Sequence, residues 1–386
     1  MNIALFLTQA FNPTQGGVQR STSKLALIYK ANGHKVVIVS LTNGENTSFN
    51  GIPVVYLGKE VRNRVSLVLK EVLKEHETQI ILNQAGSSTR TTRLLKNAVS
   101  EKVKIVNTLR INPLNFVQNS SLLFRHYLKQ RKIEFLYSRI WLVPLLAYHR
   151  IKQHLNHRYI LWHADAYVML SEGFLEELSY FGIDEKKYQD KLFAISNPFE
   201  LPKNPHSWEE KENVILFVGR LNKTQKRVDL LMKIWKELHP RLTSWQFWVV
   251  GDGQERQWME QYCKDHQMDR VHFFGYTDPT PYYRKAKLLH FTSAYEGFGN
   301  VLIEAQSYGV IPVLFNSYSA ASEIINDKKD GLLITPFQIE EFTQSTVNLL
   351  SSENQLRRLS NAAVLNTNRY GYNRIGQKWE SLFSKI

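Results

Sequence analysis

Glu296 and Glu304 lie eight residues apart on either side of a glycine turn, in the stretch of sequence best suited to chemistry. The turn contains Gly297 and Gly299, follows a predicted strand and would let the backbone approach a ligand closely. We predict that Asn300 caps the next helix, whose first amides would favour an anion. Both carboxylates could then accept hydrogen bonds from hydroxyl groups, which suits a sugar nucleotide. An ordinary strand–loop–helix connection with two solvated glutamates is the alternative.

A second cluster of chemistry-bearing residues is basic. Arg220 directly follows a predicted strand, and Lys226 is expected at the start of the next helix. Two cations there could hold a diphosphate, the arginine through paired hydrogen bonds and the lysine as a point charge. If the diphosphate departs, they would stabilise the charge that develops on it. An exposed basic loop is the alternative interpretation.

Two other glycine turns follow predicted strands, where a phosphate-binding loop could lie. Gly16 and Gly17 follow the first predicted strand and permit close backbone approach in the amino-terminal half. They do not have the G-x-G-x-x-G spacing of a dinucleotide site. Gly251 and Gly253 also follow a strand, but Arg256 stands where a third glycine would be needed, so we interpret them as a turn.

Metal chemistry is not expected from this sequence. No two aspartates are two residues apart, so the D-x-D signature of metal-dependent sugar transferases is missing. His154 and His157 share a predicted helix face but have no third ligand nearby, and Cys263 is the single cysteine. We expect neither a metal nor another cofactor.

The elements that must position these residues alternate between short apolar runs and amphipathic helical segments. Unbroken apolar runs indicate strands that are covered on both faces, and strand–helix alternation indicates a parallel sheet. The pattern restarts after a proline-bearing stretch at 198–212. We predict an α/β protein with two Rossmann-like, doubly wound domains facing across a cleft. The expected strands are 3–7, 36–40, 79–82, 103–107 and 166–170, then 214–218, 246–250, 271–274, 288–292, 311–314 and 331–334.

Residues 119–160 break this rhythm with a net charge of +7 and interleaved aromatic residues. A basic, aromatic and amphipathic helical segment is typical of a helix that lies on anionic lipid. A helical excursion packed on its own domain and a nucleic-acid surface are the alternatives, although no base-reading module is present. The predicted membrane contacts are Arg125, Lys129, Arg131, Lys132, Arg139 and Trp141.

Length and charge agree with this organisation. The 386 residues suffice for two domains, and 49 Lys plus Arg against 35 Asp plus Glu give +14, which favours polyanionic partners. The amino terminus does not resemble a secretion signal. The longest apolar run, 140–147, is far shorter than the ~20 residues of a membrane-spanning helix. We expect a cytoplasmic protein that is peripheral at the inner face of the cell membrane.

Taken together, these motifs resemble retaining glycosyltransferases of the GT-B fold, specifically glycosyltransferase family 4 with its E-x7-E motif. The resemblance covers nearly the whole chain and is strongest from 196 to 340. It rests on Glu296 and Glu304, Gly16 and Gly17, Gly219-Arg220-Leu221 with Gln225 and Lys226, Ser196-Asn197-Pro198, Val249-Val250-Gly251-Asp252-Gly253, Phe274-Gly275-Tyr276 and Asp330-Gly331-Leu332-Leu333.

The resemblance implies an amino-terminal acceptor-binding domain at 1–198, a nucleotide-sugar domain at 199–370 and a last helix, 371–386, that crosses back. It implies catalytic roles for Glu296, Arg220 and Lys226, with Glu304 on the ribose. Further implied donor contacts are Gly17, Gly275, Tyr276, Gly297, Phe298, Gly299, Asn300 and Val301. The implied reaction transfers a hexose-type sugar, from a UDP-sugar by preference, to a saccharide that is lipid-linked, in cell-surface polysaccharide or lipopolysaccharide synthesis. No nucleic acid partner is expected.

One position departs from the family pattern. Relatives commonly carry a histidine near the donor sugar where this chain has Arg110, with Asn112 close behind. An arginine cannot act as a general base near neutral pH. It would instead contact an acidic sugar, an acceptor phosphate or nothing relevant. Two other functions stay open. One is a non-catalytic sugar-nucleotide-binding or scaffold homologue, for which Arg110 is the hint, and the other is a nucleotide-dependent epimerase or oxidoreductase on a similar fold, against which the missing dinucleotide fingerprint argues.

Overall fold

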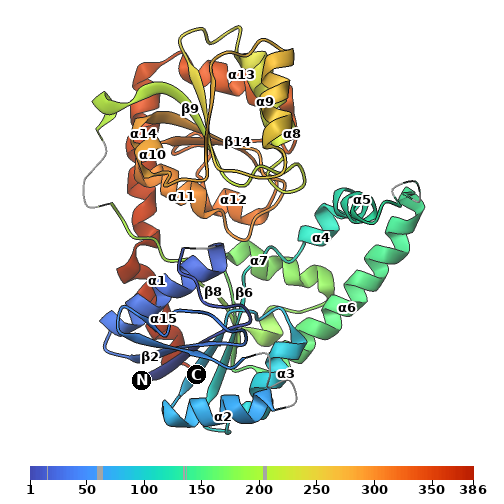
Figure 1. Ribbon diagram of the computed structural model, residues 1–386, viewed down its shortest axis with the longest axis vertical. Helices are drawn as coiled ribbons and strands as arrows, with labels where there is room; N and C mark the ends of the chain where they lie inside the picture. Colours follow the sequence, from blue (N-terminus) through green and yellow to red (C-terminus); the bar gives the residue numbers. More distant parts are fainter. Residues whose placement is uncertain (15, 59–63, 134, 136, 203–206) are drawn as a thin grey trace. The chain divides into compact units, whose positions relative to one another are not determined.

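The computed structural model describes residues 1–14, 16–58, 64–133, 135, 137–202 and 207–386, and these form two compact units (Figure 1). Unit 1 comprises residues 1–113, 141–199 and 370–386, and unit 2 comprises 114–140 and 200–369. The basic segment 119–160 is therefore divided between the units rather than lying wholly in the amino-terminal domain. The predicted linker at 198–212 includes 203–206, which lie outside the described residues.

Unit 1 is built on an eight-stranded sheet with the order β3-β4-β2-β1-β5-β6-β7-β8. All neighbouring strands are parallel except β3 and β4. The strands after β1 are added first on one side of it and, from β5 on, on the other side. Ligands of doubly wound sheets bind at such a switch point, here between β1 and β5. The strands are β1 Asn2–Leu7, β2 Lys35–Ser40, β3 Ser48–Phe49, β4 Ile52–Tyr56, β5 Ile80–Asn83, β6 Lys104–Leu109, β7 Ala166–Met169 and β8 Leu192–Ala194.

Helices cover both faces of this sheet, which explains the unbroken apolar runs. In β1, Leu5 belongs to one buried cluster, and its neighbours Ala4 and Phe6 belong to the cluster on the other face. The last helix packs on the first: Trp379 joins the cluster of Leu5, and Glu380 accepts a hydrogen bond from Asn32 at 2.9 Å. The helices are α1 Gly17–Ala31, α2 Val65–Glu75, α3 Thr89–Ala98, α6 Leu142–His163, α7 Glu172–Glu176 and α15 Tyr372–Phe383.

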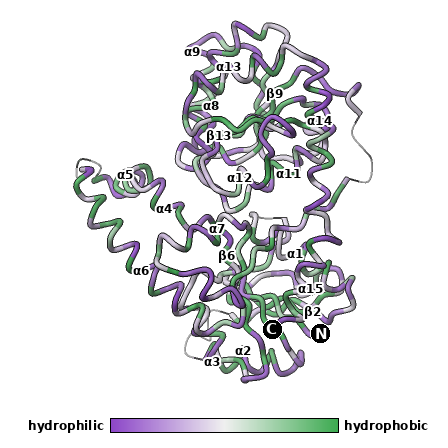
Figure 2. The backbone as a smooth tube through the Cα atoms, turned by 180° about the vertical axis from the view of Figure 1, so that it is seen from behind, coloured by the Kyte–Doolittle hydropathy of each residue, from purple (hydrophilic) through white to green (hydrophobic). Residues whose placement is uncertain are grey.

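Unit 2 has a six-stranded, fully parallel sheet with the order β11-β10-β9-β12-β13-β14. Hydrophobic residues concentrate in the strands of both sheets (Figure 2). The strands are β9 Glu212–Val218, β10 Gln246–Val250, β11 Val271–Gly275, β12 Ala286–Phe291, β13 Ile311–Phe315 and β14 Leu332–Ile334. The helices are α4 Asn115–Gln118, α5 Ser120–Gln130, α8 Val228–Leu238, α9 Arg256–Asp265, α10 Thr280–Lys285, α11 Asn300–Ser307, α12 Ser319–Ile324, α13 Ile339–Leu350 and α14 Glu353–Thr367.

Every predicted strand is present, with ends shifted by one or two residues. Three further strands, β3, β4 and β8, were not predicted. They lie at or next to the ends of the first sheet, and β3 and β8 are only two and three residues long. No helix within the described ranges combines the length and apolarity that crossing a bilayer requires.

Candidate functional site

The centre of the site in unit 2 is a buried ion pair between residues that are 70 positions apart in the chain. Lys226 Nζ lies 2.6 Å from Glu296 Oε1. The two residues are only 7% and 8% exposed. Gln225 Nε2 donates to the other carboxylate oxygen at 3.3 Å. Two of the predicted catalytic residues are thus in direct contact, and each satisfies the other's charge.

The loop that carries Lys226 is fastened to the end of β12. Asn222 Oδ1 accepts from the backbone amides of Gln225 and Lys226, at 3.0 and 2.9 Å. The Lys226 carbonyl accepts from the Thr292 hydroxyl at 2.8 Å, and the Ala294 amide donates to the Gln225 carbonyl at 2.7 Å. These bonds hold the lysine in place before any ligand arrives. Lys226 itself precedes α8 by two residues rather than starting it.

Arg220 lies on a tightly packed glycine junction at the carboxyl end of β9. A Cβ on Gly251 would lie 1.9 Å from the Gly219 carbonyl oxygen, so only glycine fits there. The Leu221 amide donates to the Asp252 carbonyl at 2.9 Å. This contact gives the turn at 251–253 a structural role, as predicted. The Arg220 side chain is exposed and, within the described ranges, forms no ion pair.

The glycine turn begins α11 in a way that differs from the prediction. The helix starts at Asn300 and its cap is Gly299, with φ of 99°, so the prediction of Asn300 as the cap was wrong. A Cβ on Gly299 would lie 2.5 Å from the Tyr318 hydroxyl, so this left-handed turn accepts only glycine. Phe298 is buried, and Val301 is half-buried in the first helical turn.

Other predicted donor contacts follow strands β11 and β12, whose carboxyl ends lie at the same edge of the sheet. Glu304 lies in the second turn of α11, is half-buried and accepts from the Tyr283 hydroxyl at 3.2 Å. Gly275 ends β11 with φ of 72°, and Tyr276 after it is 82% exposed. Because these strands are parallel, their carboxyl ends meet at one edge, beside Arg220 and the ion pair.

Unit 1 has its own cavity of about 320 Å³, lined by both polar and apolar residues, at the carboxyl ends of β1, β5 and β6. Arg110, at the end of β6, lines it and donates through Nε to Gln84 Oε1 at 2.9 Å and through Nη1 to Asn197 Oδ1 at 2.7 Å. Burial lowers the pKa of Arg110 to about 10. The lining residues are Leu7, Thr8, Gln9, Val18, Gln19, Gln84, Ala85, Ser87, Thr108, Arg110 and Ile111.

Two predicted residues of unit 1 differ in how far they can reach a ligand. Gly17 is exposed at the start of α1, and a Cβ there would meet nothing within 4 Å. Asn112 is only 1% exposed, so its side chain faces the protein interior. Sequence reasoning missed Gln84. Its position one residue after β5 was the available signal, because ligands gather at the carboxyl ends of parallel strands.

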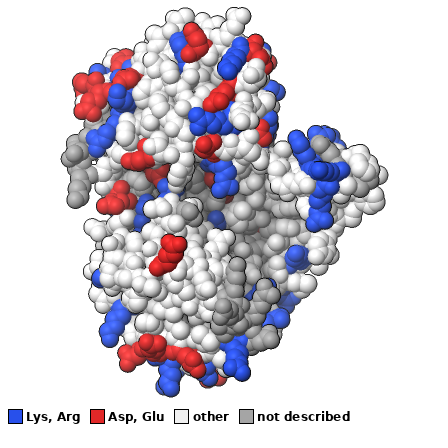
Figure 3. All heavy atoms as spheres, in the orientation of Figure 1, with Lys and Arg blue, Asp and Glu red and all other residues white. Residues whose placement is uncertain are grey.

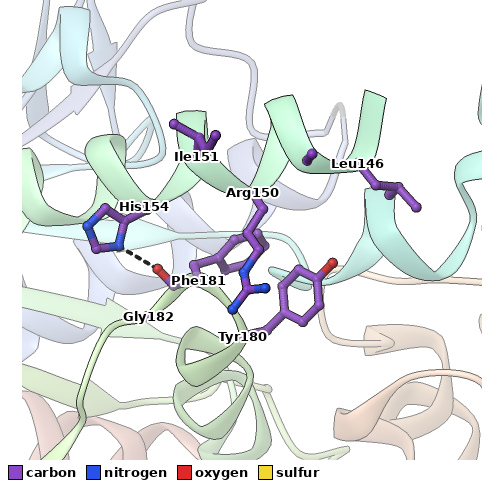
Figure 4. Close-up of a pocket in the computed structure, with 8 residues that line it drawn as sticks. Leu146, Arg150, Ile151, His154, Tyr180, Phe181 and Gly182 are labelled. Carbon is purple, nitrogen blue, oxygen red and sulfur yellow. Dashed lines mark hydrogen bonds between the residues drawn. The ribbon is translucent and has the colours of Figure 1, made fainter. Parts of the chain in front are cut away.

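A second cavity, of about 490 Å³, lies between α6 and residues 180–182 and is mostly apolar (Figure 4). Arg150 reaches from α6 towards the Tyr180 ring, 5.1 Å from its centre. His154 Nδ1 bonds the Phe181 carbonyl at 2.6 Å, while burial lowers the pKa of His157 to about 4. Both histidines therefore have structural partners. Among the described residues, no three His, Cys, Asp or Glu side chains group as metal ligands.

The outer face of α6 exposes an apolar stripe. Tyr148, Ile151, Leu155 and Trp162 follow one another at intervals of three, four and seven residues, which is one face of a helix. Their exposed fractions run from 59% to 78%. Basic side chains gather over the α5 segment, which precedes α6 in the chain (Figure 3). All six predicted membrane contacts, Arg125, Lys129, Arg131, Lys132, Arg139 and Trp141, are exposed.

Comparison with known proteins now gives this geometry a context. Residues 199–365 match the family model of glycosyl transferases group 1. That segment holds Arg220, the Lys226–Glu296 pair and Glu304. The family match thus falls on the domain in which the predicted donor residues come together.

Sequence similarity to individual glycosyltransferases extends into the first domain. An amylovoran biosynthesis glycosyltransferase, AmsD of Erwinia amylovora, is 29% identical over 55% of this chain and 63% of its own length. A Campylobacter jejuni enzyme named as a GalNAc-alpha-(1->4)-GalNAc-alpha-(1->3)-diNAcBac-PP-undecaprenol alpha-1,4-N-acetyl-D-galactosaminyltransferase is 28% identical over 81% of this chain and 91% of its own. The similarity to AmsD therefore spans less than two thirds of that relative.

The fold is shared with solved GT-B glycosyltransferases. Anabaena HepE, solved in complex with UDP and glucose, superposes with a TM-score of 0.72 at 17% identity, covering 100% of both chains. The predicted fold class of two Rossmann-like α/β domains is thereby confirmed.

Proposed function

We propose that this protein is a retaining, metal-independent glycosyltransferase of family 4. It would move a hexose-type sugar from a nucleotide-diphosphate donor, a UDP-sugar by preference, to a hydroxyl of a saccharide acceptor. The observation that carries the proposal is the buried Lys226–Glu296 pair beside exposed Arg220, in the domain that matches group 1 glycosyl transferases. The complex of HepE with UDP and glucose supports uracil as the nucleotide base of the donor.

The contacts that these residues make without a sugar nucleotide suggest how they act when one binds. Arg220 has an exposed guanidinium that can take two phosphate oxygens, and the amides at the start of α11 can take a third. A phosphate beside Lys226 would share the lysine charge. Glu296 could then turn its oxygens, now held by Lys226 and Gln225, to sugar hydroxyls. Glu304 would exchange its bond from Tyr283 for bonds from ribose hydroxyls.

The same cations would lower the barrier to transfer. As the bond to the sugar breaks, negative charge develops on the diphosphate, and preorganised donors in a dry site stabilise such charge. The leaving phosphate would itself take the acceptor proton while the acceptor attacks from the same face. This front-face course, with retention, comes from the family resemblance, and the charges around Lys226 are compatible with it.

We further propose that the acceptor is a lipid-linked saccharide of cell-surface polysaccharide or lipopolysaccharide synthesis, used at the inner face of the membrane. The C. jejuni relative is named for an undecaprenol-linked substrate. The apolar stripe of α6, with Trp162 78% exposed, could enter the lipid interface while the basic side chains of 125–139 face anionic headgroups.

Thermal unfolding with UDP, GDP, ADP, CMP and NAD, each with EDTA present, tests the donor site. A ligand at 100 times its dissociation constant adds about 2.7 kcal/mol, which is several degrees for a chain of this size. We expect a shift with one nucleoside diphosphate, UDP first. A shift with NAD alone would favour the oxidoreductase or epimerase alternative. No shift with any nucleotide would favour a non-catalytic homologue.

Vesicle flotation tests the membrane proposal separately. We expect binding to anionic vesicles, release by high salt and weak binding to neutral vesicles. Replacing Leu155 and Trp162 by serine should reduce binding more than replacing exposed Leu365 of α14 by serine. Equal binding of both variants would count against the α6 stripe as the lipid-facing surface.

A further inference from the structure

The cavity of unit 1 contains a positive charge that the described protein residues do not neutralise. Arg110 is held by two neutral amides, Gln84 and Asn197. None of the carboxylates in the described ranges forms an ion pair with it. The other group that acts on its charge is Tyr29, whose hydroxyl stays neutral because burial raises its pKa. Among the described residues, then, no carboxylate supplies a counter-charge, and a ligand could bring one.

Hydrogen-bond donors are also in excess around this arginine. A guanidinium has five N–H donors, and three of them reach Gln84 or Asn197. Because arginine can only donate, the oxygen of Gln84 must face it, and that oxygen also accepts from Thr108. The amide nitrogen of Gln84 is then buried without a partner, in a residue that is 3% exposed and lines the cavity.

A half-buried cation without a carboxylate partner gains when a ligand brings the opposite charge. Removing a charge from water costs free energy that only a paired charge or good hydrogen bonds offset. Burial accordingly lowers the pKa of Arg110, yet at about 10 the group remains charged at neutral pH. The cavity is thus suited to an anionic group rather than to a neutral sugar ring alone.

We infer that Arg110, positioned by Gln84 and Asn197, binds an anionic group, a phosphate or a carboxylate, on the acceptor substrate. This inference rests on the proposed function, because it takes the ligand of unit 1 to be the acceptor. Arg110 is then a specificity-determining residue that selects charged acceptors. The cavity, of about 320 Å³, has room for such a group and part of the sugar that carries it.

Isothermal titration of the full chain tests this inference with glucose 1-phosphate, glucuronate and uncharged glucose, with and without UDP. We expect at least one anion to bind more tightly than glucose in both conditions. Arg110→Gln should lower the affinity for that anion by roughly 10- to 100-fold, as expected for hydrogen bonds to a charged group. Gln84→Glu should lower this affinity similarly, because the new carboxylate would neutralise Arg110 from within the protein. Circular dichroism checks that both variants fold.

Arg90→Gln is the matched control, because it removes an exposed arginine from α3 of the same unit. This variant should bind the anion with an affinity within about twofold of the wild-type value. Equal affinity for glucose and both anions would overturn the inference, as would unchanged anion affinity in Arg110→Gln. Anion binding that UDP abolishes in the wild type would place the anion in the donor site and also overturn the inference. UDP binding that persists in these variants separates such failures from failure of the proposed donor site.

Discussion

Each unit of this protein places a cation at the carboxyl edge of its parallel sheet, but the two cations have different partners. Lys226 in unit 2 has a carboxylate, Glu296, at 2.6 Å. Arg110 in unit 1 has the amide oxygens of Gln84 and Asn197. A cation that is paired with a carboxylate is stable without a ligand, and it can also interact with a ligand's phosphate when one binds. A cation held only by amides is oriented but not neutralised, so its ligand must supply the charge.

The largest effect should come from replacing the carboxylate of the pair by an amide. Glu296→Gln removes the charge that faces Lys226 and the acceptor of sugar hydroxyls. We expect turnover to fall by about 10³-fold, on the scale of a lost transition-state contact. The free energy of unfolding should fall by about 3 kcal/mol, because the lysine is left buried without its partner.

The control for that stability change removes both charges together. Lys226→Met with Glu296→Leu should recover most of the lost unfolding free energy in urea denaturation, although not the turnover. If Glu296→Gln alone lowers the unfolding free energy by less than 1 kcal/mol, the pair does not have the energetic role assigned to it.

Arg220→Ala should reduce turnover by about 10²-fold without loss of stability, because the side chain is exposed and acts only on the donor. Arg220→Lys should recover part of the activity, since it keeps the charge but not the paired hydrogen bonds. Steady-state kinetics and thermal unfolding measure the two effects. Turnover within threefold of the wild type in Arg220→Ala would remove this residue from the donor site.

Gln84→Glu is the reverse exchange, since it gives the cation of unit 1 a carboxylate. We expect the free energy of unfolding to rise by roughly 1–2 kcal/mol, in the range of a hydrogen bond to a charged group. The matching Glu296→Gln change lowers it, so the two isosteric substitutions should move stability in opposite directions. A destabilised Gln84→Glu variant would show that Arg110 needs no counter-charge.

A further effect, on how stability depends on pH, concerns another buried cation, Lys211, whose ammonium donates to the Tyr283 carbonyl at 2.7 Å. Burial lowers its pKa to about 7. Between pH 7 and about 10 the unfolded chain therefore binds more protons than the folded one, and stability should rise with pH. The slope from this group is at most about 1.4 kcal/mol per pH unit. Urea denaturation of Lys211→Met across this range should lack that contribution, whereas an unchanged slope would assign it elsewhere.

The sequence predicted the strands well because parallel sheets with both faces covered leave long apolar runs, as in β1 with Leu5 and Phe6 in different clusters. It also predicted that Lys226 and Glu296 serve one site. Their direct pairing across 70 residues could not be predicted, since contacts at that separation depend on how strands order in the sheet. The same holds for Arg110 and Asn197, which are 87 residues apart.

The error at Asn300 has a local cause. Asparagine is a favoured cap, but the left-handed turn before α11 admits only glycine, because Tyr318 occupies the space of a Cβ on Gly299. A tertiary contact therefore moved the start of the helix by one residue relative to the prediction.

The most direct test of the comparison is one titration set, with UDP and with glucose 1-phosphate, on the wild type, Arg110→Gln and Arg220→Ala. We expect Arg110→Gln to lose affinity for glucose 1-phosphate and keep that for UDP, while Arg220→Ala does the opposite. Loss of both affinities in one variant, with the other variant like the wild type, would contradict the assignment of separate donor and acceptor cations.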